Sequence, residues 1–170
     1  AVEYARVNKV PFLGICLGMQ MAVIEYARNV KKIRYANSTE ISEKCKDPVI
    51  DLMKSQKEII NKGGTMRLGA WDCEILKNTI SNKIYSKKVV SERHRHRYEF
   101  NDEYSKKIFD ENFIVAGKNP ETNLVEIVEN KNHPWFVGVQ FHPEYKSSVY
   151  NPHPIFVNFV KASLKNYLKK

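Results

Sequence analysis

The chain has 170 residues, 42% of them hydrophobic, and carries a formal net charge of +9. This size suits one domain with a single core, and no run approaches the roughly 18 apolar residues of a membrane span. Residues 1–10 lack the apolar run and cleavage pattern of a signal peptide, so we expect a cytoplasmic protein without a membrane partner. The even spread of lysines favours a solvated basic surface over a dedicated site for an anionic partner.

The first part of the chain predicts alternating helices and strands. Residues 1–5 already have a mid-helix pattern with no capping residue before them, so we expect the chain to be part of a longer protein. The predicted elements that follow are a buried strand at 11–15, a helix at 17–30, a loop or helix cap within 36–48, a strand at 48–52 and an exposed lysine-rich stretch at 54–62.

The second part predicts a turn at 63–69, a strand at 71–76, a helix at 78–85, an extended segment at 89–101, a helix at 102–111, strands at 113–116, 124–129 and 136–141, and a helix at 154–168. The strands near both ends of the chain are apolar without alternation, which is typical of strands covered on both faces. We therefore expect one α/β domain, 1–170, with a mostly parallel open sheet and helices on both faces.

A cysteine lies between two glycines in Gly14-Ile15-Cys16-Leu17-Gly18, where the first strand pattern becomes helical. A free thiol has a pKa of about 8.5, and the unpaired N–H groups at a helix start favour its thiolate. We attribute both glycines to a strained nucleophile elbow, in which strand and helix approach closely. The N–H of Leu17 is then the first donor of an oxyanion hole.

A histidine and a carboxylate two positions apart end a later strand, in Gln140-Phe141-His142-Pro143-Glu144. His142 would accept the Cys16 proton, and Glu144 would orient the imidazole. Spacing of two places both side chains on one side of an extended segment, and the proline keeps His142 out of the helical region. Each residue alone has an ordinary structural interpretation, but together they predict a catalytic triad of Cys16, His142 and Glu144.

These two motifs, with Met19-Gln20 continuing the first, resemble the triad-type class I glutamine amidotransferases. The resemblance implies a flavodoxin-like fold and attack of the cysteine on the side-chain amide of L-glutamine. A glutamyl thioester forms, ammonia leaves, and hydrolysis releases glutamate. No cofactor and no metal is implied for this step.

Four further segments, 36–40, 63–69, 93–101 and 132–137, resemble the glutaminase domain of the CTP synthase family, and the alternating arginine and histidine run at 93–97 is the most specific of them. The family implies a covalently linked synthetase domain, which uses ATP and Mg²⁺ to aminate UTP, with GTP as effector, in a homotetramer. We expect an N-terminally truncated glutaminase domain, with the second oxyanion donor on a glycine-rich loop outside the chain.

The same resemblance implies that glutamine is bound by Leu17, Gly18, Met19, Gln20, Glu40 and Arg97. Gln20 and Glu40 would contact its amino-acid group, and Arg97 its carboxylate. A free amino acid carries a cation and an anion on one carbon, so a pocket with a carboxylate and a guanidinium placed apart is chemically reasonable. Gln20 lies one helical turn after Cys16 on the same face. Without the resemblance, Gln20 would be interpreted as a solvent-facing helix residue, Glu40 as a helix or loop cap and Arg97 as a surface cation.

Other interpretations of the basic run are a nucleic-acid site and a zinc site formed by His94 and His96 with Cys45 or Cys73. We favour neither, because the three widely spaced cysteines lack Cys-x-x-Cys spacing and suit a reducing compartment without disulfides. Strand alternation also separates the arginines from the histidines. For the whole chain, the alternatives are another triad amidotransferase or peptidase relative, and a catalytically silent regulatory or interaction module.

Overall fold

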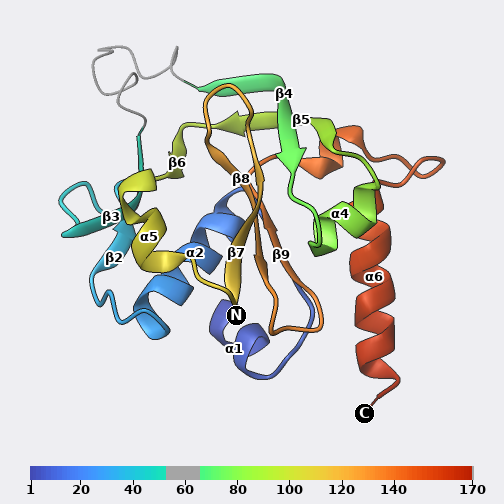
Figure 1. Ribbon diagram of the computed structural model, residues 1–170, viewed down its shortest axis with the longest axis horizontal. Helices are drawn as coiled ribbons and strands as arrows, with labels where there is room; N and C mark the ends of the chain where they lie inside the picture. The colour runs from blue at the N-terminus through green and yellow to red at the C-terminus, as the bar shows by residue number, and fades with distance from the viewer. Residues whose placement is uncertain (53–65, 170) are drawn as a thin grey trace.

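The computed structural model of the chain describes residues 1–52 and 66–169 (Figure 1). The predicted lysine-rich stretch at 54–62 and the first part of the predicted turn at 63–69 lie outside these residues. The elements, in chain order, are α1 (Val2–Val7), β1 (Phe12–Ile15), α2 (Leu17–Asn29), β2 (Ala36–Ser38), β3 (Asp47–Leu52), β4 (Arg67–Ile75), α4 (Ile80–Tyr85), β5 (Val89–His96), β6 (Tyr98–Phe100), the 3₁₀ turn η2 (Asp102–Tyr104), α5 (Ser105–Ile108), β7 (Phe113–Lys118), β8 (Val125–Asn130), β9 (Phe136–Val139), the 3₁₀ turn η3 (Pro143–Lys146) and α6 (Pro154–Tyr167).

The main sheet has six described strands in the order β1-β9-β8-β7-β4-β5. β1 and β9 pair in parallel, whereas every later neighbour in that order is antiparallel. The α/β class is therefore confirmed, but the expectation of a mostly parallel sheet is wrong for the described strands. The sequence pattern misled because β8 and β9 are buried along their whole length, which reflects covered faces rather than strand direction.

Helices cover both faces of this sheet, as predicted. On one face Met19 of α2 packs in a core cluster with Val128 and Phe136. On the other face Ile155 of α6 packs in a second cluster with Val137. Figure 1 shows α6 running along the side of the sheet opposite α2. Alternate residues of the central strands thus supply two separate cores, and the strands themselves form the shared middle layer.

A small second sheet has the order β2-β3-β6. Its first strand, Ala36–Ser38, lies where the sequence indicated a loop or helix cap, and that expectation is wrong because the strand is too short to show a period. Arg97 interrupts the extended segment expected at 89–101, so that β5 belongs to the main sheet and β6 to the small one.

Two other predicted boundaries differ from the structure. Residues 67–69, expected in a turn, already form the start of β4. The helix expected at 102–111 ends at Ile108, because the Asp110 carboxylate accepts hydrogen bonds from the N–H groups of Asn112 and Phe113 and turns the chain toward β7.

Gly14 and Gly138 are direct partners across the parallel β1–β9 pair. A Cβ on Gly14 would lie 2.6 Å from the backbone C and O of Gly18, and one on Gly138 would lie 2.9 Å from Cγ of Met19. The first turn of α2 therefore rests on two adjacent glycines. Gly18 has a different role from the one expected, because a Cβ there would meet nothing within 4 Å.

We predict that Gly14→Ala destabilises the domain by about 1–3 kcal/mol, because the new methyl group meets rigid backbone. The matched variant Gly18→Ala adds the same methyl group into open space and is expected to leave stability unchanged. Scanning calorimetry of the intact protein measures both unfolding midpoints. Equal midpoints for the two variants would contradict this account of the elbow.

Candidate active site

Cys16 lies at the junction of β1 and α2 in the strained conformation expected of an elbow. It is the N-cap residue of α2, with φ 50° and ψ −105°, a region that non-glycine residues enter only when their surroundings impose it. Its N–H donates to the carbonyl of Val139 at 2.7 Å. The predicted position of Cys16 at a helix start is confirmed.

The parallel pairing of β1 with β9 brings the two sequence motifs to one edge of the sheet. Ile15 is opposite Val139, so Cys16 and the segment that begins at Gln140 leave neighbouring strands at the same end. Beyond β9, the N–H of Gln140 still donates to Glu126 O at 2.8 Å, and the N–H of His142 donates to Arg93 O at 2.8 Å. Main-chain hydrogen bonds therefore hold the second motif beside the elbow.

His142 and Glu144 form the predicted contact, with Nδ1 and Oε1 2.5 Å apart. The expected geometry is wrong in one respect, because Glu144 lies in η3 rather than on an extended segment. His142 itself is non-helical, with φ −111° and ψ 88°, as the following proline requires. The other ring nitrogen, Nε2, is buried and has no hydrogen-bond partner among the described residues. This nitrogen can therefore accept a proton from the substrate or nucleophile, or donate one, without breaking another hydrogen bond within the described part of the chain.

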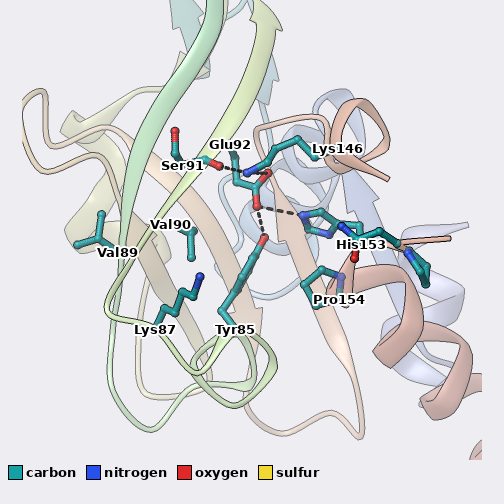
Figure 2. Close-up of a pocket in the computed structure, with 11 residues that line it drawn as sticks. Tyr85, Lys87, Val89, Val90, Ser91, Glu92, Lys146, His153 and Pro154 are labelled. Carbon is teal, nitrogen blue, oxygen red and sulfur yellow. Dashed lines mark hydrogen bonds and ion pairs between the residues drawn. The ribbon is translucent and has the colours of Figure 1, made fainter. Parts of the chain in front are cut away.

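The turn that carries Glu144 is fastened to β5 by a buried carboxylate, Glu92 (Figure 2). Glu92 Oε1 accepts from the Tyr85 hydroxyl at 2.9 Å and contacts His153 Nε2 at 3.0 Å. Lys146 Nζ, at the end of η3, lies 3.9 Å from Glu92 Oε2 and donates to Ser91 O. These contacts tie η3, α4 and the start of α6 to one strand, which restrains the histidine and glutamate motif.

The surroundings of the Cys16 thiol disfavour its ionised form in the free protein. Burial raises its pKa to about 11; hydrogen bonding to the Leu17 N–H opposes this rise, while the carboxylates of Glu40, Glu99 and Glu144 add to it. The helix start therefore favours the thiolate as expected, but burial of the thiol outweighs this contribution.

Two glutamines form a buried amide chain beside the sulfur. Gln20 Nε2 donates to Tyr98 O at 2.9 Å and to Gln140 Oε1 at 3.2 Å, and Gln140 Nε2 lies 3.6 Å from Cys16 Sγ. Gln20 is 2% exposed, so the surface interpretation that it has without the resemblance is wrong. Gln140 was not predicted as a site residue. Its signal in the sequence is a lone polar residue within the apolar run that ends β9.

A buried charge cluster lies on β4, β5, β6 and β8 next to these glutamines. Arg67 contacts Glu126 at 2.5 Å and Glu99 at 3.4 Å, while His94 Nδ1 lies 2.8 Å from His96 Nε2. Burial raises the pKa of Glu99 to about 8 and of Glu126 to about 7, although Arg67 opposes both rises. Burial and Arg67 lower the pKa of His94 to about 2 and of His96 to about 3, so both imidazoles are neutral at pH 7.

The predicted separation along the basic run is confirmed, because His94 and His96 are buried while Arg93 and Arg95 are exposed. In place of a zinc site, each histidine contacts a carboxylate, His94 with Glu126 at 3.5 Å and His96 with Glu99 at 3.4 Å. The described residues include no group of three or more histidine, cysteine, aspartate or glutamate side chains arranged to hold a metal ion. Sequence reasoning missed Arg67, Glu99 and Glu126, because the ion pairs of Arg67 join it to carboxylates at least 32 residues away.

The remaining predicted pocket residues fall into two groups. Leu17 and Glu40 are exposed, Gly18 and Arg97 are partly exposed, and Glu40 and Arg97 both act electrostatically on Tyr98. Met19 differs, because its side chain is fully buried in the core and its N–H donates to Cys16 O. Of these residues, Gln20 contacts the Tyr98 carbonyl, and the structure leaves no side chain of Met19 for a ligand.

Cysteines and helices complete the description. Cys16, Cys45 and Cys73 are all free thiols, and burial raises the pKa of Cys73. None of the helices within 1–52 and 66–169 is long and apolar enough to cross a membrane.

Comparison with known proteins places this arrangement in a family. The model of the family "Glutamine amidotransferase class-I" matches residues 1–162. CTP synthase of Christiangramia forsetii is 59% identical over 170 residues, which are 100% of this chain and 31% of that protein. CTP synthase of Flavobacterium johnsoniae is 59% identical over 169 residues, 99% of this chain and 32% of that protein. The chain therefore spans about a third of the length of these relatives.

Solved structures agree with the family match. The glutaminase domain of Trypanosoma brucei CTPS with bound acivicin superimposes with a TM-score of 0.89 at 39% identity, over 96% of this chain and 64% of that one. A glutamine amidotransferase from Thermotoga maritima gives a TM-score of 0.52 at 17% identity, over 84% of this chain and 44% of that one, which shows a shared fold alone. The predicted class I amidotransferase fold is confirmed.

We predict that Cys16 of the ligand-free intact protein reacts slowly with iodoacetamide near neutral pH and that its rate rises about tenfold per pH unit between about pH 7 and 9. The sign follows from the raised pKa, because the unreactive neutral thiol persists up to about pH 11. Peptide-resolved mass spectrometry measures the rate, and Cys16→Ser is the control for assigning the adduct. A plateau below pH 8 would contradict the prediction.

Proposed function

The chain belongs to the class I glutamine amidotransferases, and we propose that it is the glutamine-hydrolysing part of a CTP synthase. The observation that carries the proposal is that Cys16 and the His142–Glu144 pair leave neighbouring parallel strands at one edge of the sheet. The likeness to CTP synthases over the whole chain supports the choice of member.

In this proposal Cys16 Sγ attacks the side-chain amide carbon of glutamine while its proton passes to His142 Nε2. The Leu17 N–H donates to the oxygen that becomes negative. His142 then returns the proton to the amide nitrogen, the C–N bond breaks, and ammonia leaves a glutamyl thioester on Cys16. Water next attacks the thioester, giving one proton to His142, and the thiol and glutamate are released. Glu144 holds the imidazole at Nδ1 throughout.

The substrate's amino-acid group is assigned to Glu40, Arg97 and Gln20. Glu40 faces the substrate ammonium, and Arg97 faces the carboxylate. Gln20 can offer only part of its amide to the substrate, because its Nε2 already donates to Tyr98 O and Gln140 Oε1 within the protein. Its Oε1 is buried with no hydrogen-bond partner among the residues that the structure describes, and it is the atom that can accept from the ammonium. Leu17 and Gly18 contribute backbone groups.

The proposal assigns the ammonia to a covalently linked synthetase domain, within a cytoplasmic homotetrameric ligase of pyrimidine nucleotide synthesis. There ammonia aminates UTP to CTP. ATP, Mg²⁺ and the effector GTP belong to that part of the enzyme, and no residue described in this chain is assigned to them. The glutaminase step itself uses only the side chains and N–H groups named above.

We predict that Cys16→Ala in the intact protein abolishes CTP formation from glutamine and leaves CTP formation from ammonium chloride intact. The reason is that external ammonia enters after the step that needs the thiolate. Ammonia release and CTP formation measure the two activities, and a diazoketone analogue of glutamine should label Cys16 in the wild type. The matched control Cys73→Ala, at a buried thiol, should keep the glutamine-dependent reaction.

Two outcomes would contradict the proposal. Glutaminase activity that is indifferent to UTP and ATP, with no CTP formed, would indicate another triad amidotransferase. Glutamine-dependent activity and glutamine affinity that survive Cys16→Ala would indicate a catalytically silent module.

A further inference from the structure

We propose that Gln140 is a positioning residue, whose side-chain amide donates a hydrogen bond to the Cys16 sulfur and whose orientation is set by Gln20 and the carbonyl of Tyr98. The inference rests on the proposed function, because it takes Cys16 to be the nucleophile. It adds to the triad a donor from the residue that follows β9, separate from the Leu17 N–H on α2.

The position of Gln140 is fixed by its main chain. Its N–H donates to Glu126 O at 2.8 Å, and its neighbour Val139 is in register with Ile15. The side chain is fully buried, so water does not compete for the amide. Nε2 is 3.6 Å from Cys16 Sγ, within the longer range of hydrogen bonds to sulfur. A donor at this distance favours the thiolate over the thiol, because an ionised acceptor forms the stronger hydrogen bond.

The direction of the Gln140 amide follows from a group that can only accept. The carbonyl of Tyr98 has no proton, so Gln20 must direct its Nε2 toward it, at 2.9 Å. The second proton on that nitrogen then meets Gln140 Oε1 at 3.2 Å. With its oxygen engaged by Gln20, Gln140 can present only its NH₂ group to the sulfur. The reversed amide would place an oxygen against the thiolate.

Such a donor meets an electrostatic need of the site. Burial and the carboxylates of Glu40, Glu99 and Glu144 all disfavour a negative sulfur, and the Leu17 N–H opposes them. Gln140 adds a second N–H donor to the sulfur without adding a charge. A neutral donor leaves His142 free to take up and return the proton, whereas a fixed cation would compete with the imidazolium for Glu144.

The test replaces Gln140 in the intact protein with Met, which keeps the length and removes the donor, and with Glu, which places an acceptor against the sulfur. We expect the alkylation rate of Cys16 by iodoacetamide at pH 8 to fall about tenfold in Gln140→Met and further in Gln140→Glu, because each pKa unit changes the thiolate fraction about tenfold. The kcat of glutamine hydrolysis should fall in parallel, with KM nearly unchanged, since no contact between Gln140 and glutamine is proposed.

Asn119→Asp is the matched control. Asn119 is also buried and donates its amide to a carbonyl, that of Asp72 at 2.8 Å, so it tests the loss of a buried amide away from Cys16. The alkylation rate of Cys16 in the Asn119→Asp variant should equal that in the wild type.

Wild-type alkylation in a folded Gln140→Met variant would overturn the proposal. If that variant does not fold, Gln20→Met removes the orienting donor while Gln140 stays, and wild-type alkylation there would overturn it equally. Thiol alkylation requires no glutamine hydrolysis. Failure of the proposed function, seen with Cys16→Ala, is therefore distinguishable from failure of this inference.

Discussion

The close approach of α2 to β1 and β9 is the constraint on which the site depends. Adjacent glycines, Gly14 and Gly138, let the first turn of α2 lie directly on two neighbouring strands. Because the helix begins so close to the strand ends, the linking residue Cys16 must adopt φ 50°. The same geometry turns Gln20, one helical turn later, into the interior rather than toward solvent. The backbone strain at Cys16 and the burial of the Gln20–Gln140 amide chain thus both result from the close packing of α2 on β1 and β9.

The buried charge cluster around Arg67 contributes more to the positions of the site residues than to the stability of the fold. One guanidinium, Arg67, faces the two carboxylates of Glu99 and Glu126, and ionising both would leave an uncompensated negative charge in a dry interior. Their raised pKa values, about 8 and about 7, express that cost. The cluster also holds the main chain of the site, because His96 Nδ1 lies 3.2 Å from the carbonyl oxygen of Tyr98. The same carbonyl orients Gln20. The cluster therefore reaches the sulfur through this chain of hydrogen bonds as well as through the carboxylate of Glu99, which helps to raise the pKa of Cys16.

How much of this could be predicted depends on the range of the interactions. The elbow and the histidine and glutamate pair are local patterns, and the sequence predicts their chemistry because each motif carries its geometry within a few residues. Gln140, Arg67 and Glu126 escaped notice because the hydrogen-bond and ion-pair partners of their side chains lie at least 32 residues away along the chain. The expected parallel sheet was wrong for a similar reason, since apolar strands report covered faces and say nothing about the direction of a neighbour. Short elements such as β2 lack any period to detect.

The most specific run in the sequence, 93–97, acquires a physical meaning from its place between the two halves of the site. On β5, the carbonyl of Arg93 accepts from His142, and Glu92 restrains η3. On β6, just past the break at Arg97, the carbonyl of Tyr98 directs Gln20 toward Gln140. One segment thus fixes the base from one end and the sulfur's donor from the other. Alternation along it places histidines in the buried cluster and arginines outside, so a substitution at a histidine position disturbs both halves together, whereas one at Arg93 or Arg95 alters only the surface.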